Sequence, residues 1–518
     1  MLTLPSMLER TARMHGGNIA IRDAESDLDW RAYVARSARA AGMLQDLGLR
    51  RGERFAILSR NSARYAELLH AAYWLGVVPV PLNFRLAPAE IAQVLEDSGC
   101  RVVAVEEPYA TQLALAPLDA WRSRAFCLGA VSGAGLPCYD ALRDAARALD
   151  PNDPDEADDA ILLYTGGTTG RGKGVRLSHR NVMCNALQLA RTMSVTQADR
   201  YLHVSAMFHS TDLKATAVSL HGGGHAYIPE FTPRAVLGAI RDYRITIGSL
   251  VPTMIIRMLR DASLEEFDLA TLRLISYGTS PMPAEWIRRT MQAFPGVDMH
   301  QVYGLTETSP VLAILDEDDH RRALAGREDL LHAGGRALPG LDVRIVDGDG
   351  RDVARGISGE IVVRGPQVSC GYHNRPEENA AVFRGGWFHT GDVGRLDDEG
   401  YIFVQDRKKD MVVTGGENVY TSEVEAVICR HPDVVEVAVV GVPDERFGEA
   451  LCAVIVPAPG KRPAAEDVIA HCRAHIGGYK IPRRISLVDA LPKSAMGKVL
   501  KEELRRQMRA QPTKETVP

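Results

Sequence analysis

Up to about residue 330, the chain alternates between short apolar runs and longer stretches with apolar residues at helical spacing. Residues 54–58 and 102–105 are largely apolar runs bounded by polar residues, and such runs are typical of buried strands. Residues 65–74 show the spacing of a helix. Strands that alternate with helices predict a parallel-rich sheet with helices on its faces. We therefore predict an α/β fold for this part of the chain.

The pattern changes further along the chain. Residues 249–252 and 272–278 still end apolar runs in turn residues, but from residue 342 onward short strands follow closely, at 343–346 and 359–364. After residues 401–410 an α+β unit of about 110 residues begins, which is close to the usual lower size of a domain. We predict a large N-terminal domain that includes a β-rich subdomain, followed by a small α+β C-terminal domain.

A loop rich in glycine and threonine follows the apolar run 160–163. Residues 164–175 read YTGGTTGRGKGV, with five glycines and three threonines. Glycines let backbone N–H groups approach a polyphosphate, hydroxyls donate hydrogen bonds, and a lysine adds charge. The spacing of Gly167, Gly172 and Lys173 matches a Walker A loop, but Gly174 stands where a Ser or Thr would hold magnesium. We predict a nucleotide-binding loop of another type; a surface turn is the alternative for the segment taken alone.

Composition and charge limit the classes of function. The chain has 518 residues, of which 46% are hydrophobic and 25% charged, and its net charge is −5. This length supports more than one domain, and no basic block indicates binding to nucleic acid. The eight cysteines lack metal-ligand spacing, which indicates the reduced thiols of a cytoplasmic protein. Neither a signal peptide nor a transmembrane span is predicted, so we expect a cytoplasmic protein.

Four further segments combine turns with polar and charged residues. Residues 276–281 (SYGTSP) predict a strand end and a tight turn, where open α/β sheets bind ligands. Residues 303–307 (YGLTE) offer an aromatic ring, a hydroxyl and a carboxylate, which suit adenine, phosphate and Mg²⁺. Residues 389–392 (HTGD) end in an aspartate suited to ribose hydroxyls, and residues 492–499 (PKSAMGKV) contain two lysines. Each segment alone has a structural alternative, such as a turn or a solvated charge.

Together and in this order, the loop and these segments closely resemble the motifs of the adenylate-forming superfamily, which includes acyl-CoA ligases, luciferases and amino-acid adenylation domains. The resemblance covers essentially the whole chain, and the family motif YGxTE is fully matched. The family usually has Ser at the position of Gly166. The glycine lacks the serine hydroxyl, so one possible phosphate donor is missing, but the backbone N–H is kept. The resemblance implies an N-terminal adenylation domain over 1–405 and a mobile C-terminal domain over 407–518, with a hinge at Asp406.

The resemblance also implies a role for each matched residue. Lys498 would reach the carboxylate and the α-phosphate during adenylation, and Glu307 would hold Mg²⁺. The catalytic set would be Lys498, Thr306, Glu307 and His209. ATP would bind Thr165, Gly166, Gly167, Thr168, Thr169, Gly170, Lys173, Gly278, Thr279, Ser280, Tyr303, Gly304, Thr306, Asp392, Arg407 and Lys498. The acid would bind Phe208, Asp212, Thr216, Leu220, Tyr277, Gly278 and Ser280. ATP and Mg²⁺ are the implied cofactors, and residues 415–420 would approach the thiol acceptor once the small domain has rotated.

The segment 206–215 bears on which acid is activated. Phe208 and His209 match acyl-CoA ligases, whereas an Asp212 carboxylate facing a hydrocarbon would be desolvated and unpaired. A substrate ammonium group would be its partner, as in the similar freestanding adenylation enzymes for β-amino acids of macrolactam polyketide pathways. Thr216 and Leu220 follow at helical spacing on the same face. Two alternatives stay open: Asp212 caps the following helix, and Leu220 is a core leucine.

We therefore predict ATP-dependent adenylation of a carboxylic acid, a short β-amino acid similar to 3-aminobutanoate, and its transfer as a thioester to a freestanding acyl carrier protein. A fatty or aryl acyl-CoA ligase, with CoA as the acceptor, is the alternative within the superfamily. A non-catalytic nucleotide-binding relative is a third hypothesis, against which the intact Glu307, Asp392, Arg407 and Lys498 argue. No carrier segment is evident in the sequence, so the carrier would be a separate chain.

Overall fold

The chain forms two units in a computed structural model. The structure describes residues 2–115, 117–165, 172–261, 264–414, 417–444, 446–493 and 499–510. The first unit contains residues 1–342 and 363–388, and the second contains residues 343–362 and 389–518. The predicted hinge, Asp406, lies inside the second unit by this division, and its role as a domain boundary stays a prediction.

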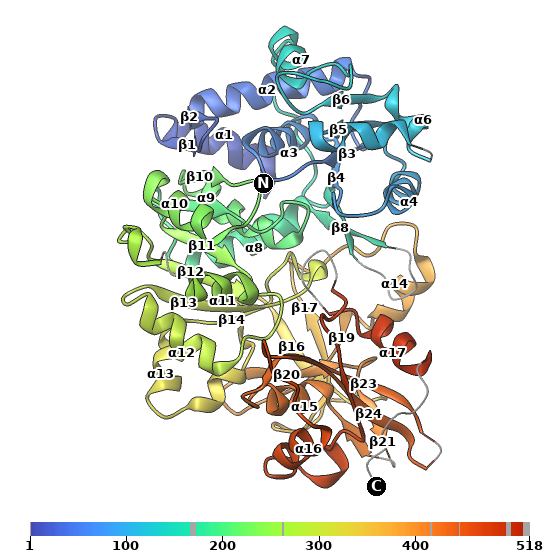
Figure 1. Ribbon diagram of the computed structural model, residues 1–518. Coiled ribbons are helices and arrows are strands. Elements are labelled where there is room, and N and C mark those ends of the chain that lie inside the picture. Colours follow the sequence, from blue (N-terminus) through green and yellow to red (C-terminus); the bar gives the residue numbers. More distant parts are fainter. Residues whose placement is uncertain are drawn as a thin grey trace. The chain divides into compact units, whose positions relative to one another are not determined.

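The first unit is built on a largely parallel sheet (Figure 1). Its strands are β1 (Ile19–Arg22), β2 (Asp27–Asp29), β9 (Arg200–His203), β10 (Gly224–Tyr227), β11 (Ile247–Leu250), β12 (Leu274–Gly278), β13 (Asp298–Tyr303), β14 (Ala313–Leu315) and β15 (Gly335–Ala337). The strands β13, β12, β11, β9, β10 and β1 run parallel in that order, while β2 and β14 are antiparallel to their neighbours β1 and β13. The carboxyl ends of β11, β12 and β13 therefore meet at one edge, where ligands of open α/β sheets bind.

Two smaller sheets complete the first unit. A parallel sheet has the order β4 (Val78–Pro81), β3 (Arg54–Leu58), β5 (Val102–Val105) and β6 (Ala125–Cys127), which confirms the strands predicted at 54–58 and 102–105. The strands β7 (Asp159–Thr165) and β8 (Lys173–Ser178) form an antiparallel hairpin around the glycine-rich segment. A Walker A loop opens a helix, whereas this segment leads into a strand, in agreement with the missing Ser or Thr.

Helices flank the sheets of the first unit. They are α1 (Leu4–His15), α2 (Trp30–Asp46), α3 (Ala63–Leu75), α4 (Pro88–Ser98), α5 (Glu107–Ala110), α6 (Asp119–Arg122), α7 (Tyr139–Ala145), α8 (His179–Thr192), α9 (Thr216–Leu220), α10 (Pro233–Tyr243), α11 (Pro252–Arg260), α12 (Ala284–Ala293), α13 (Glu317–Leu324) and α14 (Pro376–Val382). The helix predicted over 65–74 is confirmed as α3. Its first turn is capped by the Ser62 hydroxyl, which accepts from the Tyr65 N–H, and it ends at Gly76 with φ +78.

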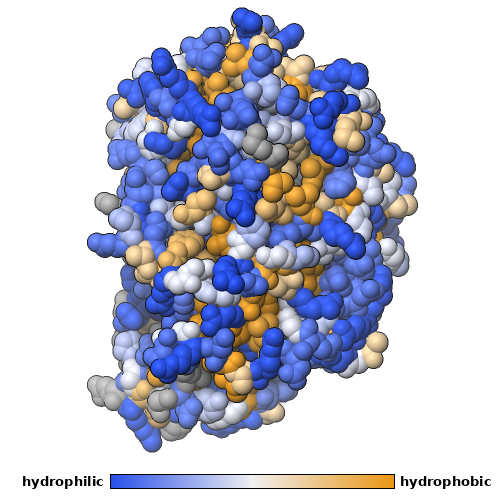
Figure 2. All heavy atoms as spheres, turned by 180° about the vertical axis from the view of Figure 1, so that it is seen from behind, coloured by the Kyte–Doolittle hydropathy of each residue, from blue (hydrophilic) through white to orange (hydrophobic). Residues whose placement is uncertain are grey.

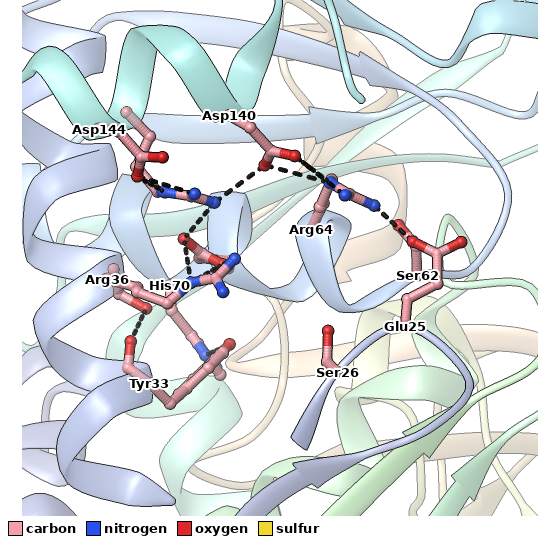
Figure 3. Close-up of polar contacts among 12 residues, drawn as sticks. Glu25, Ser26, Tyr33, Arg36, Ser62, Arg64, His70, Asp140 and Asp144 are labelled. Atoms are coloured by element: carbon pink, nitrogen blue, oxygen red, sulfur yellow. Dashed lines mark hydrogen bonds and ion pairs between the residues drawn. The ribbon is translucent and has the colours of Figure 1, made fainter. Parts of the chain in front are cut away.

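An ion-pair network joins α2, α3 and α7. The Glu67 carboxylate is 1% exposed and lies 2.8 Å from the Arg36 guanidinium and 3.6 Å from that of Arg143. Arg143 also contacts Asp140, which accepts from Arg64 at 2.9 Å (Figure 3). A buried carboxylate needs such partners because an unpaired one costs several kcal/mol. The network therefore links these helices, beside a partly polar and partly apolar cavity that α2 and α3 help to line.

The second unit is rich in β-structure. The strands β16 (Asp342–Val346), β17 (Gly359–Arg364), β19 (Trp387–Leu396) and β20 (Tyr401–Arg407) follow in that order, and β18 (Phe383–Arg384) pairs with the start of β19 in the first unit. A second sheet has the order β22 (Glu417–Val419), β21 (Val412–Thr414), β24 (Gly448–Pro457) and β23 (Val434–Asp444), and β25 (Arg484–Leu487) pairs with β24. Its helices are α15 (Thr421–Ile428), α16 (Ala465–Arg473) and α17 (Lys501–Ala510). The predicted β-rich stretch and α+β C-terminal part are confirmed.

The surface is mainly hydrophilic on the face in Figure 2, where charged and polar residues surround smaller apolar areas. Within the described ranges, no helix has both the length and the apolar character that a bilayer span requires. The predicted cytoplasmic location stays a prediction.

Candidate active site

The turn after β12 has the geometry of a ligand-binding strand end. A Cβ atom on Gly278 would lie 2.2 Å from the Val302 carbonyl oxygen, so only glycine lets β12 lie this close to β13. Thr279 has φ +70, a left-handed conformation that is strained for a β-branched residue. Such strain is concentrated at ligand-binding turns. The exposed Thr279 and Ser280 therefore extend the carboxyl edge of the sheet, as the predicted ATP contacts require.

The motif YGLTE continues from β13 into a short 3₁₀ helix, η4 (Thr306–Thr308). Tyr303 ends the strand, and a Cβ atom on Gly304 would lie 2.1 Å from the Pro310 carbonyl oxygen, so the motif needs a glycine there. The Thr306 hydroxyl lies 3.1 Å from the hydroxyl of Ser210, the first residue of the 3₁₀ helix η2 (Ser210–Ala215). The structure thus brings Thr306 next to the segment predicted to bind the acid.

Glu307 is held by a tyrosine outside the predicted site. The Tyr372 hydroxyl donates to Glu307 Oε1 at 2.7 Å, and the Lys173 ammonium lies 5.2 Å over the Tyr372 ring. Lys173 also forms an ion pair with Glu378 of α14. Tyr372 therefore connects the predicted magnesium ligand with the lysine of the glycine-rich loop. The sequence gives no indication of this role, because Tyr372 lies 65 residues from Glu307 and outside every motif.

A single carboxylate such as Glu307 suits Mg²⁺, which keeps water and phosphate oxygens as its other ligands. Within the part of the chain that the structure describes, no cluster of three His, Cys, Asp or Glu side chains could hold a metal ion. These residues fit a Mg²⁺ ion that arrives with ATP, and the ion would offset phosphate charge there.

Several predicted residues lie outside the described ranges. Thr165 and Lys173 are register partners at the loop end of the β7–β8 hairpin. The residues between them that were predicted to bind ATP are Gly166, Gly167, Thr168, Thr169 and Gly170, and like Lys498 they fall outside the described residues. Their roles stay predictions.

In the segment 208–212, the residue that caps η2 is not Asp212. His209 is the N-cap, and its Nδ1 atom accepts from the Thr211 N–H at 3.3 Å. The hypothesis that Asp212 caps this helix is therefore wrong, since Asp212 lies inside the first turn. Phe208 is buried and packs edge-on against Phe84, with ring centroids 5.5 Å apart.

Asp212 has partners within the protein. Its Oδ1 atom lies 2.6 Å from His203 Nδ1, and His203 Nε2 lies 3.0 Å from His225 Nδ1. His225 Nε2 lies 3.0 Å from the Ser219 hydroxyl. Burial lowers the pKa of His225 well below its usual value, so this histidine is neutral at pH 7. The premise that the Asp212 carboxylate would be unpaired without a substrate is therefore not met.

Asp212 and Thr216 face a cavity of about 50 Å³. The aromatic side chains of Trp30, Tyr73 and Tyr227 line it as well, so it is partly polar and partly apolar. Leu220 is not among its lining residues and packs against the apolar cores of the first unit. This packing agrees with the alternative that Leu220 is a core leucine.

Neighbouring positions of β12 point to opposite faces of the sheet. The Tyr277 ring is fully buried, and its hydroxyl contacts His320 of α13 at 2.8 Å and Gln301 at 3.1 Å. Ser276 lies on the other face, where its hydroxyl contacts Lys214 of η2. The Tyr277 hydroxyl therefore forms its hydrogen bonds on the face of the sheet opposite to η2.

The predicted ribose ligands pair with each other in the second unit. Asp392 and Arg407 are register partners on β19 and β20, and Arg407 Nε lies 2.6 Å from Asp392 Oδ1. One residue earlier, the Asp406 carboxylate accepts from the N–H and the hydroxyl of Thr421, both at 2.6 Å. The predicted hinge residue therefore binds the first residue of α15, an interaction that the sequence does not reveal.

Comparisons with known proteins agree with this arrangement. The family model for AMP-binding enzymes matches residues 8–373, and the model for the AMP-binding enzyme C-terminal domain matches residues 423–498. The chain is 36% identical to an indoleacetate–CoA ligase of Aromatoleum aromaticum, with 97% of this chain and 98% of that protein covered. It is 37% identical to a feruloyl-CoA synthase of an Amycolatopsis species, covering 96% and 97% of the two chains. The crystal structure of ATP-bound MatB from Rhodopseudomonas palustris is similar, with a TM-score of 0.88, 31% identity and 98% and 99% coverage. The chain therefore belongs to the AMP-binding, adenylate-forming enzyme family, and it is an ATP-dependent ligase that forms an acyl-adenylate and then a thioester.

Proposed function

We propose that the protein is an acyl-CoA ligase that activates an aryl or fatty carboxylic acid and transfers it to CoA. The observation that carries this choice is the hydrogen bond between Asp212 and His203, at 2.6 Å. It gives the buried carboxylate a partner, so an amino-acid substrate is no longer needed to account for it. The names of the two relatives, indoleacetate–CoA ligase and feruloyl-CoA synthase, support an aryl acid and CoA.

The first half-reaction joins the acid to AMP. A carboxylate oxygen of the acid attacks the α-phosphorus of ATP, a P–O bond forms, and pyrophosphate leaves. Thr306 would donate to the α-phosphate, and Glu307, oriented by Tyr372, would hold the Mg²⁺ that offsets the phosphate charge. Lys498 would stabilise the charge that develops in the transition state.

The second half-reaction forms the thioester. The thiol sulfur of CoA attacks the acyl carbon, its proton goes to solvent or a base, and AMP leaves. We propose that the part of the chain after Asp406 rotates between the half-reactions, so that residues 415–420 replace Lys498 near the acyl-adenylate. Hinges of this kind are a few residues that absorb the backbone change.

Pyrophosphate exchange followed by mass spectrometry tests this proposal. The acids would be indoleacetate, ferulate, octanoate and 3-aminobutanoate, each with ATP and Mg²⁺, and then with CoA or a phosphopantetheinylated carrier protein. We expect exchange with aryl or fatty acids and acyl-CoA as the product. Exchange with 3-aminobutanoate alone, with loading of the carrier protein and not of CoA, would favour the β-amino acid hypothesis instead. In that case Asp212→Asn should abolish the activity.

A further inference from the structure

Lys214 of η2 is a buried lysine with few partners. Its side chain is 2% exposed, and its ammonium group donates one hydrogen bond, to the Ser276 hydroxyl at 3.1 Å. A lysine ammonium has three donors, so two remain without an acceptor within the described residues. A buried charge in this condition is costly unless another group provides an acceptor or a counter-charge.

A second incomplete polar group lies beside it. Ser249 of β11 is the register partner of Ser276 of β12, so the two side chains lie next to each other on the same face of the sheet. The Ser249 Oγ atom is buried and has no partner at normal hydrogen-bond geometry among the described residues, although the Tyr201 phenol lies close enough for a weak hydrogen bond with it. Lys214, which contacts Ser276 of β12, and Ser249 of the adjacent strand β11 thus both have unused hydrogen-bonding capacity on the same face of the sheet.

This polar group lies near the reacting end of the predicted acid site. Ser210, which contacts Thr306, and Lys214 belong to the same 3₁₀ helix and are four residues apart. At a rise of about 2 Å per residue, their backbones are separated by roughly 8 Å along the helix. An acid of about this length, with its carboxylate at the α-phosphate near Thr306, would be long enough for its distal part to reach Lys214.

The protonation state of Lys214 depends on its surroundings. Burial lowers its pKa from 10.5 to about 7, and the nearby Asp212 carboxylate opposes this shift. Asp212 is the charged group whose field acts on Lys214 among the described residues, and its own hydrogen bond goes to His203. An anionic or strongly polar ligand group would stabilise the protonated lysine.

We propose that Lys214 is a specificity-determining residue whose ammonium group, together with the Ser249 hydroxyl, binds a second oxygen acceptor on the distal part of the acid. This inference rests on the proposed acyl-CoA ligase function and narrows its substrate class. The favoured acids carry a second carboxylate or a ketone oxygen in addition to the carboxylate that is activated.

Matched acids test the inference. Phenylacetate is compared with its para-carboxy, para-acetyl and para-isopropyl derivatives, in which the isopropyl group has the shape of a carboxylate without its oxygens. The ratio of kcat/KM for the oxygen-bearing acids to that for the isopropyl acid is measured by pyrophosphate exchange. We expect wild type to prefer the oxygen-bearing acids. Comparison of the para-carboxy acid with the para-acetyl acid shows whether the preferred acceptor is anionic or neutral.

The Lys214→Met variant should lower this ratio about tenfold or more, because a hydrogen bond from a charged donor is lost. Its kcat/KM for the isopropyl acid should change less than its kcat/KM for the oxygen-bearing acids. Lys461→Met is the matched control, since Lys461 is 59% exposed and lies in the second unit. Circular dichroism and ATP binding check that the variants fold. If Lys214→Met does not fold, Ser249→Ala tests the inference instead, and it should lower the ratio by about threefold or more.

An unchanged ratio in a folded Lys214→Met variant would overturn the inference. So would a wild-type enzyme that adenylates only the acids without a second oxygen, and in that case the ligase function itself would stand. Failure of every acid to support exchange would instead overturn the proposed function, and this inference with it.

Discussion

Burial of the Lys214 ammonium group should cost the protein stability, and Lys214→Met should recover it. Methionine keeps a similar length but has no charge. The pKa of Lys214 falls from 10.5 in the unfolded chain to about 7 in the folded protein. The unfolded chain therefore binds the proton more tightly, so between pH 7 and pH 10.5 wild-type stability rises with pH. The cost is complete below pH 7 and absent above pH 10.5.

The size of this cost follows from the two pKa values. At ~1.4 kcal/mol per pH unit, the difference between 10.5 and about 7 corresponds to ~5 kcal/mol below pH 7 and to ~2 kcal/mol at about pH 9. Loss of the hydrogen bond to Ser276 offsets ~1 kcal/mol of the gain. We therefore expect Lys214→Met to be more stable than wild type by a few kcal/mol at about pH 6, and by less at higher pH.

Thermal unfolding of wild type, Lys214→Met and the control Lys461→Met between about pH 6 and about pH 9 measures this effect. The difference in Tm between Lys214→Met and wild type should be largest at the acidic end and shrink toward pH 9, whereas Lys461→Met should follow wild type throughout. A constant difference across the pH range, or a wild type more stable than Lys214→Met at about pH 6, would show that the buried charge of Lys214 does not lower stability.

Four further outcomes are expected. The preference for a second oxygen should fall as pH rises above about 7, because neutral Lys214 cannot pair with an anion, and pH profiles of the para-carboxy and para-isopropyl acids measure this. Lys498→Ala should slow adenylate formation by orders of magnitude in a folded protein; single-turnover rates equal to wild type would exclude its role. Asp406→Pro should impair thioester formation more than adenylation, since proline fixes φ, and equal losses in separate assays of the two half-reactions would argue against a hinge there. Tyr372→Phe should raise the Mg²⁺ concentration needed for half-maximal activity, because Glu307 loses its hydrogen bond; an unchanged Mg²⁺ titration would contradict that link.

Local pattern was enough to predict much of the fold. The strands at 54–58 and 102–105 have the predicted bounds because each is a short apolar run that is buried almost throughout. The apolar run that was expected to end at residues 249–252 forms the strand Ile247–Leu250, and Pro252 begins α11 as a first-turn proline. Propensity and spacing act over a few residues, so the end of a strand depends on whether the residues that follow it start a helix.

The site was predictable only where a motif is continuous in sequence. The motif YGLTE and the turn after β12 lie together at the sheet edge, as expected for strand ends. Asp212, by contrast, was interpreted without its partner, because the hydrogen bond to His203 depends on how η2 packs on β9. Tyr372 and Lys214 were missed for the same reason: nothing local marks a tyrosine or a lysine that tertiary packing brings beside Glu307 or buries against Ser276.

The thioester product distinguishes an acyl-CoA ligase from a carrier-protein-loading enzyme. Incubation of the purified protein with ATP, Mg²⁺, CoA and either indoleacetate or ferulate, followed by mass spectrometry, measures it most directly. We expect the corresponding acyl-CoA together with AMP and pyrophosphate, and loss of the acyl-CoA in Lys498→Ala. Absence of any acyl-CoA across aryl and fatty acids, while 3-aminobutanoate is adenylated and loaded onto a carrier protein, would contradict it.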